Sequence, residues 1–196
     1  MLLEKLKNNH LILATQSPRR HFLMKEAGFE FEIKVPLGIE EIYPENLAET
    51  EIPKYLAELK ASWFEGKLNE KEIVITADTI VVLDNKVLGK PSSYEEAISM
   101  LRSLSGRPHD VVTGVCLLSK DKKHSFSAFS KVWFRKLTEE EIIYYVDTYK
   151  PYDKAGSYGA QEWIGYIGIE HIEGSYFNVM GLPIQMVYKE LEGFIG

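Results

Sequence analysis

The spacing of apolar and polar positions changes repeatedly between extended and helical patterns along the chain, which indicates a mixed α/β protein. Continuous or alternating apolar runs are typical of strands. Strands are expected at 11–14, 29–35, 73–83, about 110–119, 125–136 and around 166–172. Segments with helical spacing of apolar residues separate some of the expected strands, whereas other strands follow one another directly. This mixed order favours a sheet that is partly antiparallel, flanked by helices.

The expected helices are recognised by the residues at their ends. Ser17 suits an N-cap and Pro18 the first helical position, so one helix should begin at Pro18 and stop at Gly28. Two capping boxes and two prolines mark the others. These helices are expected after Ser93-x-x-Glu96, after Thr138-x-x-Glu141, near Pro53 and after Gly181-Leu182-Pro183.

Length and composition predict one soluble domain over residues 1–196, because 45% of the residues are hydrophobic and 27% are charged. The single cysteine, Cys116, lies in an apolar run, which favours a buried thiol and a reducing, cytoplasmic setting. We expect no membrane partner, since no apolar run reaches the length of a membrane span. The net charge of −6 disfavours a function in nucleic-acid binding, but it does not disfavour the binding of a small anion. A homodimer is allowed but not required.

The segment Ser17-Pro18-Arg19-Arg20 has the features of an anion-binding site. It follows a short strand and opens a helix, whose first backbone N–H groups and dipole attract negative charge. Arg19 and Arg20 oppose that dipole unless an anion is present, which favours a functional role. Pairing of both arginines with surface carboxylates is the structural alternative.

Asp78 is a carboxylate within a strand that is otherwise suited to burial. A buried carboxylate needs a metal, a cation or a set of hydrogen bonds. Thr79 adds a second polar group at the same point. A structural ion pair with an arginine is the alternative to a functional role.

Five further positions carry weaker signals. Lys90 lies in the turn Leu88-Gly89-Lys90-Pro91, where it can reach a phosphoryl oxygen, and Lys60 lies at the edge of an apolar helical stripe. Glu40 and Glu41 are paired acids in a loop, a pattern that suits Mg²⁺. Gln161 ends a glycine-rich segment, where its amide can read a base edge. The histidines have no metal-ligand spacing, so His109 and His171 are expected on the surface or satisfied in the core.

Taken together, these segments resemble the Maf family of nucleotide pyrophosphatases nearly from end to end. The resemblance is carried by 11–20, by Ala77-Asp78-Thr79 with 88–91, by 104–109 with 113–115, by 153–161 and by 174–183. It implies an elongated, two-lobed α/β fold related to inosine triphosphatases. It also implies a divalent cation, Mg²⁺ or Mn²⁺, and release of pyrophosphate by attack at the α-phosphorus.

The resemblance also assigns roles to individual residues. Asp78 matches the general base, Glu41 assists Asp78 with the metal, and Lys60 and Lys90 face the triphosphate. Positions that set substrate choice in the family correspond here to Arg19, Thr79 and Gln161. Ser17 and Arg20 belong to the segment that is expected to bind the phosphates of the substrate. The segment 153–161 looks like the subgroup that acts on dTTP and UTP.

Two other functions remain open at this point. One is a nucleotide-binding regulator of cell division that holds triphosphates with little turnover. The other is a purine-directed inosine or xanthosine triphosphatase, although the lysine-bearing N-terminal loop usual in those enzymes is not evident. The products released from a panel of nucleoside triphosphates distinguish all three.

Overall fold

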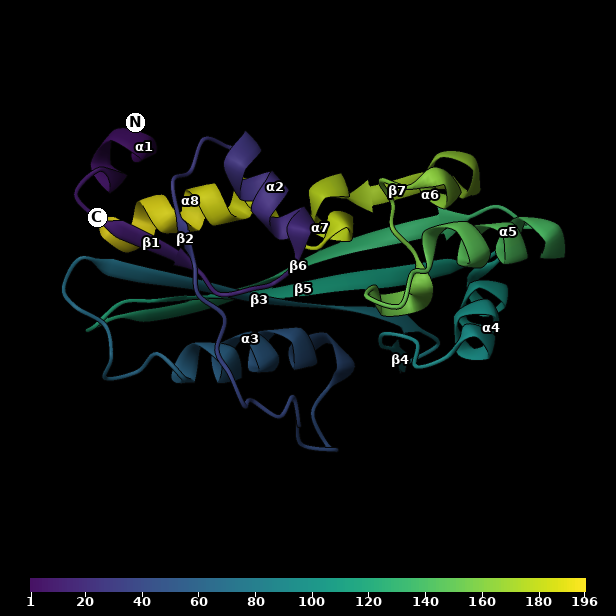
Figure 1. Cartoon of the computed structure of the whole chain (residues 1–196), viewed down its shortest axis with the longest axis horizontal. Coiled ribbons are helices and arrows are strands. Elements are labelled where there is room, and N and C mark those ends of the chain that lie inside the picture. Colours follow the sequence, from purple (N-terminus) through teal and green to yellow (C-terminus); the bar gives the residue numbers. More distant parts are fainter. The chain divides into compact units, whose positions relative to one another are not determined.

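The computed structural model describes all residues, 1–196, and contains a seven-stranded mixed sheet with flanking helices (Figure 1). Its strands are β1 (His10–Leu13), β2 (Glu32–Ile33), β3 (Glu72–Leu83), β4 (Lys86–Leu88), β5 (Pro108–Leu118), β6 (Lys123–Phe134) and β7 (Ile169–Gly174). The strand order is β2-β1-β3-β5-β6-β7, and β4 pairs with β3. Because β1 pairs in parallel with β2 and β3, while β3–β4 and β6–β7 are antiparallel, the expected α/β class with a mixed sheet is confirmed.

Eight α-helices and two 3₁₀ turns complete the chain. They are α1 (Leu2–Leu6), α2 (Pro18–Glu26), η1 (Glu49–Glu51), α3 (Ile52–Ser62), α4 (Tyr94–Leu104), α5 (Glu139–Tyr149), η2 (Ala155–Ser157), α6 (Trp163–Gly168), α7 (Tyr176–Met180) and α8 (Ile184–Ile195). None of the helices is long and apolar enough to cross a membrane.

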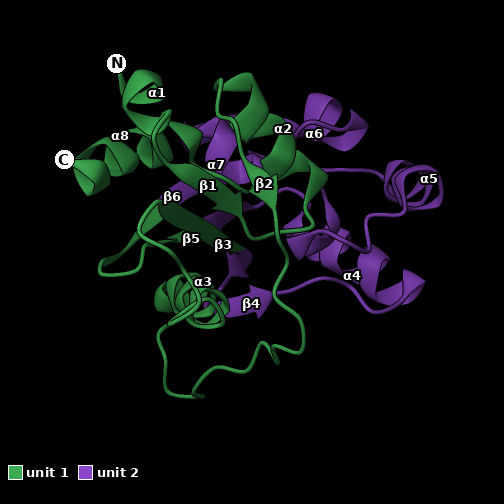
Figure 2. Ribbon diagram, turned by 60° about the vertical axis from the view of Figure 1, so that its left-hand side comes forward, with its two compact units in different colours: residues 1–78, 113–128, 181–196 green, residues 79–112, 129–180 purple.

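The chain divides into two compact units (Figure 2). Unit 1 comprises residues 1–78, 113–128 and 181–196, and unit 2 comprises residues 79–112 and 129–180. The boundaries fall within β3, β5 and β6, so each of these strands contributes residues to both units.

In unit 1, α3 covers one face of the sheet, and α2 and α8 cover the other (Figure 1). Small side chains allow α3 to approach closely, because Ala57 and Ala61 are fully buried against Ile12 and Val74. Cys116 belongs to the same apolar cluster and is a free, buried thiol, as expected.

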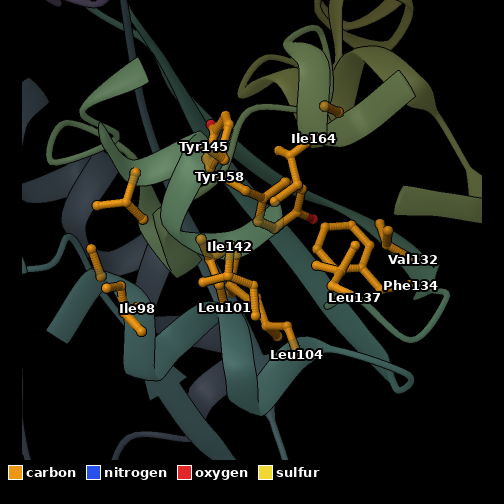
Figure 3. Packing of buried hydrophobic residues seen from close by; sticks show 14 of the residues in the cluster. Ile98, Leu101, Leu104, Val132, Phe134, Leu137, Ile142, Tyr145, Tyr158 and Ile164 are labelled. Atoms are coloured by element: carbon orange, nitrogen blue, oxygen red, sulfur yellow. The ribbon is translucent and has the colours of Figure 1, made fainter. Parts of the chain in front are cut away.

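Unit 2 has an apolar core built between α4, α5 and the ends of the long strands (Figure 3). Leu101 and Leu104 of α4 pack with Ile142 of α5, and Tyr145 and Tyr158 lie among them. Both tyrosines are almost completely buried. Polar hydroxyl groups therefore reach deep into this core.

The expected strand over 29–35 is wrong in extent, since only Glu32 and Ile33 pair with β1. The amide of Phe29 instead donates to Met24 O at 3.1 Å, which closes the C-terminus of α2, and Gly28 adopts φ +80° there. Phe29 is buried against Tyr188. Phe29 is therefore apolar because it packs at the C-terminus of α2, and not because it belongs to a strand.

The expected strand around 166–172 is also partly wrong, because α6 occupies residues up to Gly168 and β7 begins at Ile169. Ile164 and Ile167 face the unit 2 core at helical spacing. A Cβ at Gly165 would lie 2.0 Å from Ala160 O, so glycine is what allows the helix to fit.

The helix ends are predicted well, with one difference. The box at Thr138 and Glu141 forms completely. Ser93 also caps α4 by accepting from Glu96 N at 3.2 Å. The Glu96 carboxylate, however, accepts from the amide and the hydroxyl of Ser92, so this second box is incomplete.

Candidate active site

Three of the predicted site residues meet in unit 1. Lys60 Nζ of α3 lies 2.6 Å from Asp78 Oδ1 on β3 and 3.1 Å from Glu41 Oε1 in the loop before α3. The side chains of Lys60 and Asp78 are each only 14% exposed, whereas that of Glu41 is 47% exposed. We call Glu41, Lys60 and Asp78 the Lys60 cluster. The ion-pair partner of the largely buried Asp78 side chain is therefore a lysine.

The position of Lys60 follows from how α3 is seated on the sheet. Thr76, two residues before Asp78 and on the same face of β3, donates its buried hydroxyl to Ala57 O at 2.6 Å. Lys60 lies one helical turn beyond Ala57 and forms the next contact, with Asp78. Two successive polar contacts thus fix the register of α3 on β3.

Gly114 of β5 sets how closely α3 approaches. A Cβ at this position would lie 2.1 Å from Lys54 N and 2.3 Å from Pro53 C, both in the first turn of the helix. No real side chain tolerates such distances, so glycine is required there. Gly114 and Thr76 therefore place the helix that carries Lys60.

The segment Ser17-Pro18-Arg19-Arg20 opens α2, as expected, with Ser17 at the N-cap position and no acidic residue in the first turn. The Ser17 side chain makes no cap hydrogen bond, and its amide donates to Thr15 Oγ1 at 3.2 Å. The first turn therefore keeps a positive electrostatic character.

Arg20 connects this helix to the strand that bears Asp78. Its guanidinium donates to Ala77 O and Gly181 O, each at 2.8 Å, and to Thr15 Oγ1 at 3.3 Å. Burial lowers the pKa of Arg20, and the nearby Asp78 carboxylate opposes that shift. The start of α2 and the Lys60 cluster thus share one electrostatic environment within unit 1.

The Lys60 cluster also fits a hard divalent cation. Glu41 and Asp78 direct carboxylate oxygens at a single cationic atom, Lys60 Nζ. Mg²⁺ is commonly held by one or two carboxylates, with water and substrate phosphates as its other ligands. No cluster of three or more His, Cys, Asp or Glu residues forms an all-protein metal site. The donor set suits an ion that is shared with a phosphate ligand.

The remaining predicted residues belong to unit 2. Thr79 follows Asp78 on β3, and Lys90 is exposed in the turn after β4. Gln161 is half-buried, and its amide oxygen is buried without a hydrogen-bond partner. The loop before Gln161 is joined to the turn of Lys90, because Gly156 N donates to Gly89 O at 3.1 Å. Lys90 and Gln161 thus lie on connected segments.

The two histidines considered in the sequence lie in different surroundings. His109 is buried in the unit 2 core and shares a 2.7 Å hydrogen bond with the Tyr158 hydroxyl. Burial lowers the pKa of His109 to about 4. His171 is exposed beside Trp133.

Sequence reasoning singled out Lys60 and Asp78 but missed the residues that hold them, Thr76 and Gly114. Thr76 was visible as a polar interruption of an apolar strand, and Gly114 as a glycine inside another. Each of these is a signal of close backbone approach or of a buried hydrogen bond. Neither signal identifies the helix that contacts these two residues.

Comparison with known proteins places the chain among characterised relatives. The family model described as Maf-like protein matches residues 10–194. Proteins named dTTP/UTP pyrophosphatase are 51% identical in Parabacteroides distasonis, over 98% of this chain and 100% of that protein, and 52% identical in Phocaeicola vulgatus, over 97% and 99%. The Ham1 protein of Staphylococcus aureus has a similar structure, with a TM-score of 0.56 at 15% identity, covering 95% of this chain and 100% of that one. This last likeness concerns the fold alone.

Proposed function

Because the chain belongs to the Maf family, we propose that it hydrolyses dTTP and UTP to the nucleoside monophosphate and pyrophosphate. The relatives that bear this activity in their names match 97–98% of the chain at about half identity. The observation that carries the proposal is the Lys60 cluster, in which a largely buried lysine holds two carboxylates beside an anion-binding helix start.

In this proposal Asp78 is the general base. Its carboxylate accepts a proton from the attacking water, whose oxygen forms a bond to the α-phosphorus while the bond to the bridging oxygen of pyrophosphate breaks. Lys60 orients the carboxylate through the 2.6 Å contact with Oδ1. The placement of α3 by Thr76 and Gly114 therefore bears directly on the geometry of the base.

In the proposal, a divalent metal ion and several basic side chains balance the negative charge of the triphosphate. A Mg²⁺ or Mn²⁺ ion, held by Glu41 and Asp78, would supply electrophilic stabilisation of the phosphoryl oxygens. Lys60, Lys90 and Arg19 add fixed positive charge, and the first turn of α2 at Ser17 offers backbone N–H groups. Arg20 holds this turn against Ala77 O.

Substrate choice is assigned to Arg19, Thr79 and Gln161. The Gln161 amide can accept from N3–H of uracil or thymine and donate to O4 of the same base edge. Its buried, unpartnered oxygen is consistent with such a role.

We further propose that the chain is a single functional domain over residues 1–196 and that it acts in the cytoplasm. In this proposal it binds neither membrane nor nucleic acid, and it is able to form a homodimer.

The test is a panel of ribo- and deoxyribonucleoside triphosphates, incubated with protein and Mg²⁺, in which pyrophosphate and orthophosphate are measured separately. Pyrophosphate from dTTP and UTP, with little orthophosphate, supports the proposal. Tight binding without product indicates a nucleotide-binding regulator, and a preference for ITP or XTP indicates a purine-directed enzyme. Either of those results overturns it.

A further inference from the structure

Unit 2 contains a buried charged group that the proposed chemistry does not use. Lys154 is only 8% exposed, and its Nζ lies 3.0 Å from Glu162 Oε1 and 2.8 Å from Asp153 Oδ1. The second oxygen of Glu162 accepts from the hydroxyl of Tyr145, a fully buried residue of α5. That hydroxyl also accepts from Gly159 N at 3.1 Å. We call Tyr145, Lys154 and Glu162 the loop clasp.

The loop clasp fixes the two ends and the middle of one short loop. Lys154 and Glu162 bracket residues 155–161, so their ion pair closes the loop at its base. Tyr145 enters from α5 and holds the amide of Gly159 in between. Burial raises the pKa of Tyr145, with the Glu162 contact adding to the shift, so the hydroxyl remains a donor across the working pH range.

The backbone of the loop adopts conformations that surrounding contacts must enforce. Ser157 has φ +61°, a region rarely used by residues with a side chain, and Gly156 has φ +68°. A Cβ at Gly156 would lie 2.9 Å from Val81 Cγ2. The loop therefore has little freedom while its bracketing contacts persist.

Gln161 lies at the end of the loop that this arrangement fixes. It precedes Glu162 in the chain, and its carbonyl accepts from the Tyr166 hydroxyl at 2.7 Å. Its amide oxygen remains buried and without a partner. A glutamine amide that can turn over reads cytosine as well as uracil, because its donor and acceptor then exchange places. Discrimination between these bases therefore requires that the amide keep one orientation and one position against the base edge, and a fixed backbone is a precondition for both.

We propose that the loop clasp is a positioning device that fixes Gln161, so that the protein distinguishes thymine and uracil nucleotides from cytosine nucleotides. The inference rests on the proposed function for the identity of the ligand. Tyr145, Lys154 and Glu162 act through Gln161 and touch no reacting atom. Their removal should loosen base discrimination while Asp78 and Lys60 keep their contacts.

The test is Tyr145→Phe, which removes one hydroxyl and keeps the ring stacked on Tyr149, 5.1 Å away. Binding of non-hydrolysable dTTP and dCTP analogues is measured by calorimetry, and turnover of both nucleotides is measured where it occurs. The preference for the dTTP analogue should fall by up to roughly tenfold, because the energy of the lost hydrogen bond to Glu162 limits how far the loop can shift toward other conformations. KM for dTTP should rise while kcat stays within about twofold.

The matched control is Tyr149→Phe, the same change on the same helix at a side chain outside the loop clasp. It should leave the preference unchanged. An unchanged preference in folded Tyr145→Phe overturns the inference, as does an equal loss in both variants. If Tyr145→Phe does not fold, Glu162→Gln replaces it and is held to the same outcomes.

Failure of the proposed function is recognised separately. A wild-type protein that releases no pyrophosphate from any nucleotide refutes that function, whereas the ratio of the two analogue affinities is measured without turnover. Hydrogen exchange at Gly159 gives a third readout, because Tyr145→Phe should accelerate it. Acceleration without any change in base preference refutes the role in discrimination.

Discussion

Two lysines of this chain each bind a pair of carboxylates, in different surroundings. Lys60 contacts Asp78 and Glu41, and Glu41 comes from an exposed loop and is itself 47% exposed. Lys154 contacts Asp153 and Glu162, and the remaining oxygen of Glu162 is bound by the buried Tyr145. Each lysine therefore has one exposed partner, Glu41 at 47% and Asp153 at 57%. The groups differ in the second carboxylate, because Glu162 is also bound by a hydroxyl from the core.

The difference separates two uses of a buried ion pair. The Lys60 cluster can exchange Glu41 for a phosphate or a metal ion without disturbing an apolar core, which suits chemistry. The loop clasp cannot change partners without leaving a buried charge unsatisfied, which suits positioning. Substitutions should therefore reduce activity in unit 1 and reduce loop order or stability in unit 2.

The strongest effect is expected from Asp78→Asn. It keeps the size of the side chain but removes the base, so pyrophosphate release should fall by roughly 10²- to 10⁴-fold while the protein stays folded. Initial rates and a thermal unfolding curve measure the two quantities. Asp84→Asn is the control, because Asp84 pairs with Arg107 at the surface and is 63% exposed. Near-normal turnover of Asp78→Asn would remove this residue from the mechanism.

The two lysines are compared directly by Lys60→Met and Lys154→Met. Lys154→Met opens the loop at its base and leaves Glu162, whose side chain is 20% exposed, without its cation, so it should lower the free energy of unfolding by about 3 kcal/mol. Lys60→Met should lower it by only about 1 kcal/mol, because Glu41 returns to solvent and the Arg20 charge remains near Asp78.

Activity should follow the opposite order, with Lys60→Met losing more of kcat. Urea unfolding and initial rates on the same preparations provide both measurements. Equal stability losses, or a larger loss of kcat in Lys154→Met, would show that the two clusters do not differ as argued.

Gly114→Ala tests the seating of α3. The added methyl group meets the helix backbone at 2.1 Å, so we expect a loss of about 3 kcal/mol and a fall in kcat as Lys60 moves away from Asp78. Gly193→Ala is the matched control, since a Cβ there meets nothing within 4 Å. It should be neutral or stabilising by up to about 1 kcal/mol, because alanine favours the helix. A tolerated Gly114→Ala contradicts the close approach.

The last prediction concerns the stability of unit 2 in acid. The pKa of His109 is about 4 in the folded chain and 6.5 in its ordinary state, so the unfolded chain binds the proton more readily. The contribution of His109 is therefore complete above about pH 6.5 and is lost as the pH falls toward 4.

Stability should drop by about 2 kcal/mol between pH 7.5 and pH 5, as measured by urea unfolding. His109→Gln should flatten this dependence, whereas His171→Gln at an exposed position should not. If the pH dependence remains in His109→Gln, other titratable groups cause it and this prediction is wrong.

Local signals in the sequence predicted the fold well where they act over a few residues. The start of α2 at Pro18 and the capping box at Thr138 depend on neighbouring residues alone, and both are correct. The extents expected for β2 and β7 were wrong because apolar alternation does not distinguish a strand from a helix end, as at Phe29, or from a short helix, as at Ile164.

The candidate site was predicted as a set of residues but not as a set of contacts. Lys60 looked like a surface lysine, and only the placement of α3 by Thr76 and Gly114 brings it to Asp78. The same holds for Tyr145 and Glu162, which lie 17 positions apart and meet through tertiary packing. Spacing in sequence carries no information about such pairs.

The central claim is hydrolysis at the α-phosphorus of dTTP with Asp78 as the base. It is tested most directly by a single turnover of dTTP in H₂¹⁸O, with mass spectrometry of both products. Attack at the α-phosphorus places the heavy oxygen in the monophosphate and leaves pyrophosphate unlabelled, and Asp78→Asn should form the labelled monophosphate far more slowly. Label in pyrophosphate or orthophosphate, or an unaffected Asp78→Asn, would contradict the account.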